Sequence, residues 1–415
     1  MKLLLVHNSY QQPGGEDVVF EQECQLLERA GHTVIRYQRS NWEAQTYSGL
    51  KRIQLAARTV WSEDTRQDLV GLLDREHPDV VHAHNTFMMI SPSIFSACQD
   101  AEVPVVQTLH NYRMYCPAGT FFRDGHVCEE CVDHSLRRGV AHGCYRGSRA
   151  ATATIALSIS VHRKRHTWTR EVDCYIALTE FARGRFLRAG LPSEKVFVKP
   201  NFVHPDPGMQ RNGEGHYALF VGRLSEERVR TMLSAWSRLR IPRIPLVIIG
   251  GGPELERLQE ETVRRGLNEV SFRGPLPRDE AIAAMHGARF LVFSSEWYEN
   301  FPVTIAESFA CGIPVICSRI GAMQEIVDDG RTGLHFTSGD AADLAARVEW
   351  AWDHPQQMRF MGEEARRDYE TKYTAKKNYP ILANIYEHAI RRKVSALEVP
   401  AIDEDVLRTG SREHE

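Results

Sequence analysis

The chain has 415 residues, of which 42% are hydrophobic and 25% are charged, a composition ordinary for folded water-soluble proteins. This length suffices for two or three domains with buried cores. Lys plus Arg number 51 and Asp plus Glu number 54, so the net charge is −3. That balance argues against a nucleic-acid-binding protein, which usually carries a basic excess.

Hydropathy and cysteine content indicate where the protein works. The sequence has no apolar run near the ~20 residues that a membrane-spanning helix needs. The apolar run Leu3–Val6 is too short for a secretory signal and predicts a strand instead. The nine cysteines are too sparse and irregular for a disulfide-stapled secreted domain. We therefore expect a cytoplasmic protein.

Strands and helices alternate through the first half of the chain. The stretch Asp17–Ala30 carries apolar residues at mixed helical spacing and stops at Gly31, which predicts a helix. Runs rich in Val, Ile and Leu predict strands buried on both faces at Leu3–His7, Thr33–Tyr37, Val80–His84, Val103–Leu109 and Cys174–Leu178. Strand, helix and strand in repeated order predict a parallel sheet with right-handed crossovers.

A second series of the same kind begins after the polar segment Pro205–Gly215. Its strands are predicted at Tyr217–Val221, Leu246–Ile249, Val270–Phe272, Phe290–Phe293 and Pro314–Cys317. The clearest helices that follow them are Glu254–Arg265 and Pro302–Ala310, and Ala341–Glu387 is mostly helical in pattern. Two doubly wound units form a cleft between them, where ligands bind at the carboxyl ends of the strands.

Glycines occupy the loop between the first strand and the first helix. Gly14 and Gly15 let backbone amides approach a ligand, and a helix N-terminus favours negative charge. A plain tight turn explains the same residues. The run Gly250–Pro253 has the same place in the second half, but neither loop has the G-x-G-x-x-G pattern. A dehydrogenase is therefore disfavoured.

Two arginines follow the Tyr217–Val221 strand directly, in the segment Gly222–Arg228. The guanidiniums of Arg223 and Arg228 beside a strand-to-helix turn can clamp a diphosphate with charge-assisted hydrogen bonds. The alternative is a solvated basic helix start. Basic residues are electrostatically unfavourable at a helix N-terminus, and a bound anion offsets that cost.

Two carboxylates flank the start of a predicted helix. Pro302 suits the first helical position, which leaves Glu299 in the loop and Glu307 inside the helix. The loop carboxylate suits sugar hydroxyls and the helical one ribose hydroxyls. Two glutamates eight apart also arise by chance on a solvated helix face. The aromatic loop before them and the segment Ala310–Ile316 after them favour a binding site.

Together, Gly222–Ser225, the Glu299/Glu307 pair and Ala310–Val315 resemble the signature of glycosyltransferase family 4. Members of that family are retaining, nucleotide-sugar-dependent enzymes of the GT-B fold. Three segments of the first half extend the resemblance, namely Pro13–Glu16, Gln107–Tyr112 and Lys199–Val203. The resemblance covers the chain from its start to about Arg391.

The resemblance implies an α/β GT-B fold in which two Rossmann-like, doubly wound parallel-sheet domains face a central cleft. Residues 1–204 would form the acceptor-side domain, with a cysteine-rich insertion at 113–148, and residues 216–375 the nucleotide-sugar-binding domain. A helix at 376–395 would cross back to brace the first domain. Residues 396–415 are charged and aperiodic, which predicts a disordered tail.

The resemblance also implies a role for single residues. Arg223 and Arg228 would bind the donor diphosphate, Glu307 the nucleotide ribose and Glu299 the donor sugar, with His110 near that sugar across the cleft. The catalytic residues among them would be Arg223, Arg228, Glu299 and His110. Further donor contacts are implied at Gly14, Gly15, Asn201, Gly222, Phe301, Pro302, Val303 and Thr304. Same-face attack, with the departing phosphate taking the proton of the acceptor, needs neither a protein nucleophile nor a cofactor.

One position departs from the family pattern, which usually continues Glu-Lys-Gly where this chain has Glu227, Arg228 and Val229. Arg228 keeps the positive charge of the lysine. A guanidinium is longer and planar, however, and the loss of the glycine shifts the helix start. We still expect activity.

Four cysteines follow the His110 strand with C-x11-C-x2-C-x12-C spacing: Cys116, Cys128, Cys131 and Cys144. The Cys128/Cys131 pair has the spacing of a structural zinc knuckle, and four thiolates complete a tetrahedron. Free thiols and disulfides are the alternatives. A structural zinc ion is therefore our hypothesis for this insertion.

The segment 134–170 has no Asp or Glu, and its basic residues are Arg137, Arg138, Arg146, Arg149, Arg163, Lys164, Arg165 and Arg170. The apolar run Ala150–Val161 lies within it. An amphipathic basic segment suits an anionic membrane surface or a lipid-diphosphate acceptor. A buried helix with a solvated basic end is the alternative.

These features predict a retaining hexosyltransferase that uses a nucleotide-sugar donor, UDP- or GDP-linked. The expected acceptor is a glycan or a polyprenyl-diphosphate-linked glycan of a surface polysaccharide, at the inner face of the plasma membrane, and no nucleic-acid partner is expected. The alternatives are a sugar-nucleotide epimerase on the same fold and a non-catalytic zinc-containing scaffold of a glycan-assembly complex.

Overall fold

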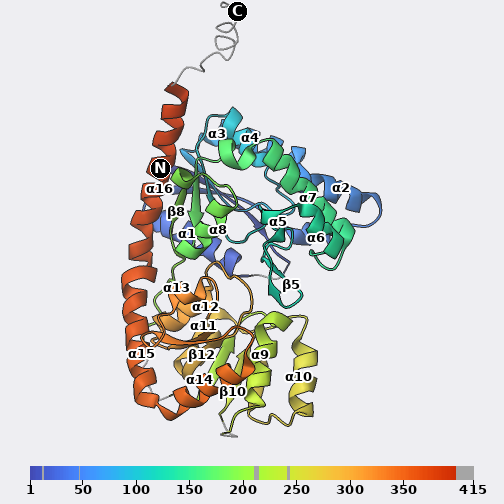
Figure 1. The fold of residues 1–415 in the computed structure, drawn as a ribbon. Helices are drawn as coiled ribbons and strands as arrows, with labels where there is room; N and C mark the ends of the chain where they lie inside the picture. Colours follow the sequence, from blue (N-terminus) through green and yellow to red (C-terminus); the bar gives the residue numbers. More distant parts are fainter. Residues whose placement is uncertain (12–13, 46, 210–214, 241–243, 399–415) are drawn as a thin grey trace, which may run out of the picture.

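The computed structural model describes residues 1–11, 14–45, 47–209, 215–240 and 244–398. Each half of the chain builds a six-stranded parallel sheet, and the two resulting α/β units lie one above the other (Figure 1). A short antiparallel hairpin, β5 (Phe122–Arg123) and β6 (His126–Val127), stands apart from both sheets. The two-sheet architecture is the one predicted from the sequence.

The strands of the first sheet are, in spatial order, β2 (Thr33–Ser40), β1 (Lys2–Ser9), β3 (Val80–Asn85), β4 (Val105–Thr108), β7 (Cys174–Ala177) and β8 (Val196–Val198). Leu3, Leu4, Leu5 and Val6 of β1 are all fully buried. Leu3 and Leu5 belong to one hydrophobic core and Leu4 and Val6 to another, because successive side chains of a strand point to opposite faces. Both faces of this sheet are therefore covered.

The strands of the second sheet are, in spatial order, β11 (Val270–Gly274), β10 (Leu246–Ile249), β9 (Tyr217–Val221), β12 (Ala288–Phe293), β13 (Val315–Ser318) and β14 (Gly333–Phe336). In both sheets every strand pair is parallel and the order reverses near the first strand of the unit. Such a reversal places ligand sites at the carboxyl ends of the central strands.

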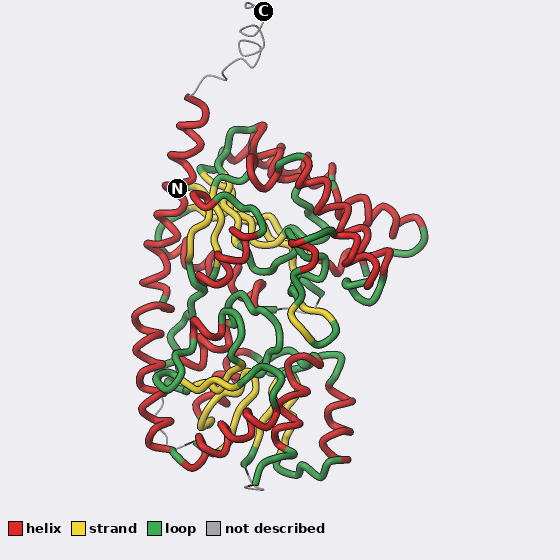
Figure 2. Tube along the Cα trace, viewed as in Figure 1, coloured by secondary structure: helices red, strands yellow, loops and turns green. Residues whose placement is uncertain are grey.

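Helices cover the two sheets (Figure 2). The helices of the first unit are α1 (Gly15–Arg29), α2 (Leu50–Val60), α3 (Glu63–Glu76), α4 (Ser93–Asp100), α5 (Glu130–Asp133), α6 (Leu136–His142), α7 (Arg149–Lys164) and α8 (Glu180–Arg188). Those of the second unit are α9 (Glu226–Trp236), α10 (Leu255–Arg264), α11 (Arg278–His286), α12 (Val303–Ala310), α13 (Met323–Ile326), α14 (Ala341–Asp353) and α15 (Pro355–Asp368). No helix of the described residues is long and apolar enough to cross a membrane.

The last helix, α16 (Ala375–Glu398), runs alongside both units (Figure 1). Its residues Leu382, Tyr386 and Ala389 are buried in the same core as Leu3 and Leu5 of the first sheet. The helix therefore packs on the first unit after the chain has completed the second. The disordered tail predicted from residue 396 is wrong for residues 396–398, which extend α16, and residues 399–415 lie outside the described part of the chain.

All strands predicted from the sequence are present. Missed were the edge strands β8 and β14 and the hairpin of β5 and β6. These elements have two to four residues each, too few for a periodic pattern to show.

Candidate active site

The candidate site lies where loops of the two units meet. Asn300, in the loop after β12, donates from Nδ2 to the Leu109 carbonyl oxygen at 3.4 Å, and its own carbonyl oxygen accepts from Thr179 Oγ1 at 3.2 Å. A Cβ atom added to Gly15 would lie 3.8 Å from Cγ2 of Val303. The structure thus brings predicted donor-binding residues of both halves together.

Two helix N-termini converge there. Helix α1 begins at Gly15 and α12 at Val303, so the Gly15–Val303 approach sets their positive ends side by side. Gly14 is the N-cap of α1, and its amide donates to Asp17 Oδ2 at 2.7 Å. The positive ends of two converging helices favour a phosphate.

Pro302, predicted at the first helical position, is instead the N-cap of α12. Its ψ of 106° is extended, and the helix begins with Val303. This corrects the sequence prediction by one residue. Thr304, in the first turn, is partly exposed. The ring of Phe301 does not line the cleft, because it packs in the core with its centroid 5.4 Å from that of Tyr373.

Arg228 and Glu299 form an ion pair. Arg228 Nη2 donates to Glu299 Oε1 at 2.6 Å, and Ser295 Oγ donates to the same oxygen at 3.0 Å. The guanidinium carbon lies 4.9 Å from the centroid of the Trp297 ring. Arg228 Nε is buried and has no hydrogen-bond partner among the described residues. The two predicted catalytic side chains therefore restrain each other.

Arg223 differs from Arg228 because it is exposed and forms no ion pair with the described residues. Next to it, Ser225 caps α9, and its Oγ atom is buried without a hydrogen-bond partner in the described structure. A Cβ atom on Gly250 would lie 1.9 Å from the Gly222 carbonyl oxygen, so the loops after β9 and β10 pack backbone to backbone. The glycine at 250 thus has a packing role.

Glu307 is held by an arginine that the sequence patterns did not identify. Arg278 Nε donates to Glu307 Oε1 at 2.7 Å, and Arg278 Nη1 donates to the His204 carbonyl oxygen at 3.3 Å. Burial raises the pKa of Glu307, although Arg278 opposes that effect. Arg278 Nη2 is buried without a partner in the described structure. The one available signal was a basic residue at the start of α11, where it is electrostatically unfavourable.

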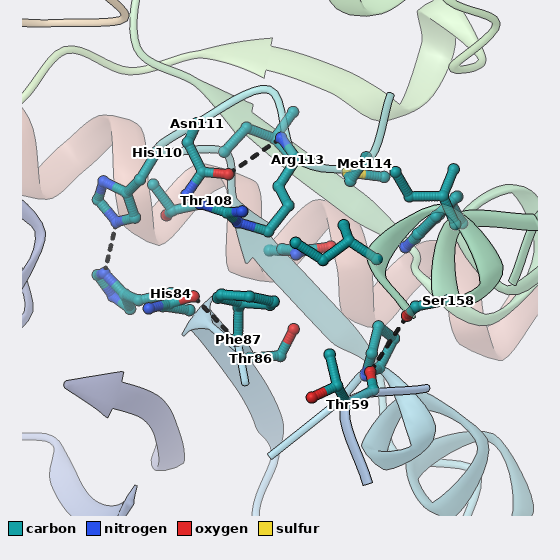
Figure 3. Close-up of a pocket in the computed structure, with 17 residues that line it drawn as sticks. Thr59, His84, Thr86, Phe87, Thr108, His110, Asn111, Arg113, Met114 and Ser158 are labelled. Atoms are coloured by element: carbon teal, nitrogen blue, oxygen red, sulfur yellow. Dashed lines mark hydrogen bonds between the residues drawn. The ribbon is translucent and has the colours of Figure 1, made fainter. Parts of the chain in front are cut away.

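His110 lies two residues after the end of β4 and faces His84 of β3 (Figure 3). His84 Nδ1 and His110 Nε2 are 3.1 Å apart, with the rings stacked. Burial lowers the pKa of both imidazoles, so both are neutral at neutral pH. Asn201, also predicted to contact the donor, is buried, and its Oδ1 has no partner among the described residues.

A buried ion pair lies behind the two histidines. Lys199 Nζ donates to Glu23 Oε1 at 2.5 Å and to Asn378 Oδ1 at 3.0 Å, and the side chains of Lys199 and Glu23 are fully buried. The other Glu23 oxygen lies 3.2 Å from His84 Nε2. Burial opposes ionisation, yet Lys199 and the neighbouring histidines hold the pKa of Glu23 well below its ordinary value.

This arrangement fixes the tautomer of His110. The Glu23 carboxylate beside His84 Nε2 favours a proton on that nitrogen, which leaves His84 Nδ1 as an acceptor. His110 Nε2 must then carry the proton that it shares with His84 Nδ1. The remaining nitrogen of His110, Nδ1, is an acceptor and suits a substrate hydroxyl as its donor.

Among the described residues, Glu23, His82 and His84 form a group of three possible metal ligands, whose ligand atoms lie within 4.8 Å of one another. His82 already uses both nitrogens, with the Tyr386 hydroxyl at 2.8 Å and Thr108 Oγ1 at 2.8 Å. Since Lys199 also occupies Glu23, a metal ion there would have to displace several buried hydrogen bonds. The group fits a hydrogen-bonded network and not a metal centre.

Two known protein families match the sequence of this chain. Residues 13–207 match the family described as Glycosyltransferase Family 4, and residues 207–368 match Glycosyl transferases group 1. The chain belongs to glycosyltransferase family 4. The two matches meet at residue 207, within the segment that links the two sheets of this glycosyltransferase.

Relatives and solved structures agree with this assignment. Glycogen synthase of Mycobacterium tuberculosis is 29% identical over 313 residues, which are 72% of this chain and 67% of the relative. D-rhamnosyltransferase WbpZ of Pseudomonas aeruginosa is 32% identical over 133 residues, 32% of this chain and 35% of the relative. HepE of Anabaena, solved with UDP-glucose, has a TM-score of 0.66 at 17% identity and covers 93% of this chain and 100% of its own. Sucrose-phosphate synthase of Thermosynechococcus elongatus has a TM-score of 0.70 at 15% identity, over 95% of this chain and 99% of its own. The predicted GT-B fold is confirmed.

Of the four cysteines of the glycosyltransferase's insertion, Cys131 lies in α5 and the other three lie in the loops before α5 and after α6. No three of their sulfur atoms are among the described groups of ligand atoms that lie within 4.8 Å of one another. Cys116 and Cys131 are buried and Cys128 and Cys144 half-buried, and all four thiols are free. Charges on the other three are close enough to act on Cys131. A Cβ atom on Gly139 would lie 3.2 Å from Cys131 Sγ, so α6 packs tightly on that sulfur.

The basic segment contains α7, whose apolar side is not free. Ile155, Ala156 and Ile159 are buried in the core of the first unit. What remains outside is the exposed side chain of Leu157 and the basic end of the helix, Arg163–Arg165. For α7 itself, the structure therefore agrees with the alternative of a buried helix with a solvated basic end.

The buried Lys199–Glu23 pair gives a double-mutant prediction. Glu23→Gln or Lys199→Met alone should lower the free energy of unfolding by about 3–5 kcal/mol, because each leaves an unpaired buried group. The double variant should lose less than either single variant. Denaturant unfolding measures all three changes, and losses that simply add would contradict the coupling.

Proposed function

We propose that this glycosyltransferase is a retaining hexosyltransferase that takes its sugar from a nucleoside diphosphate donor. The observation that carries the proposal is the set of groups at the cleft: two converging helix N-termini, unpaired Arg223, and two arginine–carboxylate pairs. Three buried atoms of the cleft have no hydrogen-bond partner among the described residues, namely Ser225 Oγ, Arg228 Nε and Arg278 Nη2. A polar ligand would satisfy them.

The donor class is supported by proteins similar to this one. HepE of Anabaena was solved with UDP-glucose, and a relative from Mycolicibacterium smegmatis, 29% identical over 220 residues, is a GDP-mannose-dependent mannosyltransferase. We therefore propose a UDP- or GDP-linked hexose. A further relative is O-antigen chain mannosyltransferase C of Escherichia coli. On that basis we propose a glycan or polyprenyl-diphosphate-linked glycan acceptor.

In the proposed mechanism, the diphosphate binds at the N-termini of α1 and α12 and to Arg223. Arg228 turns from Glu299 to the diphosphate, which frees the Glu299 carboxylate to accept hydrogen bonds from sugar hydroxyls. Arg278 fixes Glu307, whose second oxygen accepts from the ribose hydroxyls. Each carboxylate is thus positioned before the donor arrives.

The sugar is transferred on one face of its ring. The bond from the anomeric carbon to the phosphate oxygen breaks, the bond to the acceptor oxygen forms, and the acceptor's proton passes to the departing phosphate. Negative charge grows on that phosphate, so the arginines stabilise the transition state more than the ground state. His110 Nδ1 accepts from a sugar hydroxyl. The reaction needs no cofactor.

Substitutions at the cleft test the assignment. Arg223→Ala should lower kcat by about 10²-fold, because it removes a charge met in the transition state. Glu307→Ala should mainly weaken donor binding, measured by calorimetry. Arg264→Ala, at an exposed arginine of α10, is the matched control and should change neither quantity. A wild-type rate for Arg223→Ala would show that the diphosphate binds elsewhere.

The wild type also tests the two alternative functions. Conversion of the donor without any acceptor would identify an epimerase, and failure to bind any nucleotide would identify a scaffold.

We also propose a structural zinc ion held by the four cysteines of the insertion. The regular structure of the insertion is short, namely a hairpin with two-residue strands and the helices α5 and α6 of four and seven residues. Four thiolates around one Zn²⁺ would stabilise such a segment. The proposed zinc takes no part in the reaction.

Elemental analysis of the purified protein should find about one zinc per chain. Cys128→Ala should lose the metal and lower the melting temperature, whereas Cys98→Ala, at a buried cysteine of α4, should keep the metal. The proposal would be contradicted if the wild-type protein contained no metal, were fully stable, and had all four thiols reactive towards a thiol reagent.

Membrane contact is proposed for the outer edge of the first unit. Helix α2 packs beside α7 (Figure 1) and exposes Leu50 and Ile53, by 78% and 68%, next to Lys51 and Arg52. Apolar side chains flanked by basic ones suit an anionic lipid surface.

Vesicle flotation tests this contact. The wild type should float with phosphatidylglycerol vesicles at low salt and not with phosphatidylcholine vesicles, because the attraction is electrostatic. Ile53→Glu should abolish flotation, and Val263→Glu, at an exposed valine of the second unit, should not. Equal flotation with both lipids, or with neither, would contradict the proposal.

A further inference from the structure

A cavity of about 70 Å³ lies in the first unit, beside His110 (Figure 3). It is bounded by residues of β3, β4 and α7 and by the loop that follows β4. Its apolar wall includes Phe87 and Trp168, and its polar wall includes Gln107, His110 and Arg113. The arginines and glutamates proposed to hold the donor, Arg223, Arg228, Glu299 and Glu307, lie on the second unit. The residues that line the cavity all belong to the first unit, so we assign it to the acceptor side of the cleft.

Arg113 is held rigidly at the cavity. Its guanidinium carbon lies 4.1 Å from the centroid of the Phe87 ring and 5.5 Å from that of Tyr145. Nη1 donates to the Pro117 carbonyl oxygen at 3.2 Å, and a Cβ atom on Gly119 would lie 3.1 Å from Nη2. A planar guanidinium fixed against aromatic rings is oriented before any ligand binds.

The charge of Arg113 is not neutralised. It forms no ion pair with the described residues, and its Nε is buried without a partner there. Glu16 is within electrostatic range, but its Oε1 accepts from Asn111 Nδ2 at 3.0 Å, and burial raises the pKa of Glu16. A partly buried cation without a carboxylate partner is costly unless a ligand supplies the negative charge.

Gln107 supplies the second observation. Its side chain is only 8% exposed, it lines the same cavity, and its Oε1 accepts no hydrogen bond from any described residue. A buried amide oxygen of this kind needs a donor such as a hydroxyl group. The lining of the cavity therefore includes both a fixed cation and an unsatisfied acceptor.

We propose that this cavity binds an acidic group of the acceptor, a phosphate or a carboxylate, with a neighbouring hydroxyl donating to Gln107. The inference rests on the proposed transferase function and narrows the acceptor to an anionic molecule. Arg113 binds the anionic oxygens through its guanidinium fork, and the aromatic walls pack against the carbon skeleton. A neutral sugar satisfies Gln107 and leaves the charge of Arg113 uncompensated.

Calorimetry with three small probes tests the proposal on the full chain. Glycerol 1-phosphate carries a phosphate, methyl β-D-glucuronide carries a carboxylate, and methyl β-D-glucoside is neutral. At least one acidic probe should bind tenfold or more tightly than the glucoside, and the tighter of the two identifies the group. Arg113→Gln should remove that preference, Arg113→Lys should keep part of it, and Gln107→Leu should weaken every probe that binds.

Two controls separate this site from the donor site. Arg170→Gln, at an exposed arginine outside the cavity, should bind the probes as the wild type does. Nucleotide binding should survive Arg113→Gln, and probe binding should survive Arg223→Ala. If no nucleotide binds while the acidic probe does, the transferase proposal fails and the anion site stands. An Arg113→Gln variant that binds the acidic probe as the wild type does, or a wild type that prefers neither acidic probe, overturns the inference.

Discussion

Lys199 and Glu23 meet in the interior of the first unit, 176 residues apart in the sequence and without access to solvent. Because neither charge can be hydrated there, each depends on the other and on the polar groups around them. Glu23 comes from α1, and Lys199 binds Asn378 of α16 as well. This one contact therefore fixes the helix whose N-terminus faces the cleft, the helix that crosses back from the second unit, and, through His84, the orientation of His110.

The donor side of the cleft follows a different rule. Arg228 pairs with Glu299 and Arg278 with Glu307, so each of these two carboxylates has a cationic partner before a ligand binds. The two pairs are not equivalent. Arg228 is half of a pair that can separate, because it keeps contact with the Trp297 ring, whereas Arg278 is also tied to the His204 carbonyl oxygen and stays with Glu307. Arg228 is therefore suited to move towards a ligand, whereas Arg278 is suited to hold Glu307 in position.

The acceptor side has a different arrangement of charge. His84 and His110 are neutral there, and the guanidinium of Arg113 has no ion-pair partner among the described residues. A cleft with a cationic donor wall and a single fixed cation on its acceptor wall favours negatively charged partners on both sides. The small negative net charge of the whole chain gives no hint of this local arrangement.

The sequence predicted the central strands well, because Val, Ile and Leu on consecutive positions are needed wherever a strand is covered on both faces. The family resemblance also implied that Arg223, Arg228, Glu299 and Glu307 line one cleft. It could not show that Arg228 pairs with Glu299, because that contact joins residues 71 apart. Arg278, Glu23 and Gln107 were missed for the same reason, since each gains its meaning from partners that only the fold brings near. The backbone of Phe301 was placed at the cleft, but packing against Tyr373 decided where its ring points.

The account depends on one property, that the cleft binds a nucleoside diphosphate. Thermal unfolding of the wild type with UDP, GDP, ADP and TDP, each near 100 times its Kd, measures this directly. One of these nucleotides should stabilise the protein by about 2.7 kcal/mol and raise its melting temperature, and Glu307→Ala should need more of that nucleotide for the same rise. A melting temperature that no nucleotide changes, or a rise that is identical in Glu307→Ala, would contradict the account.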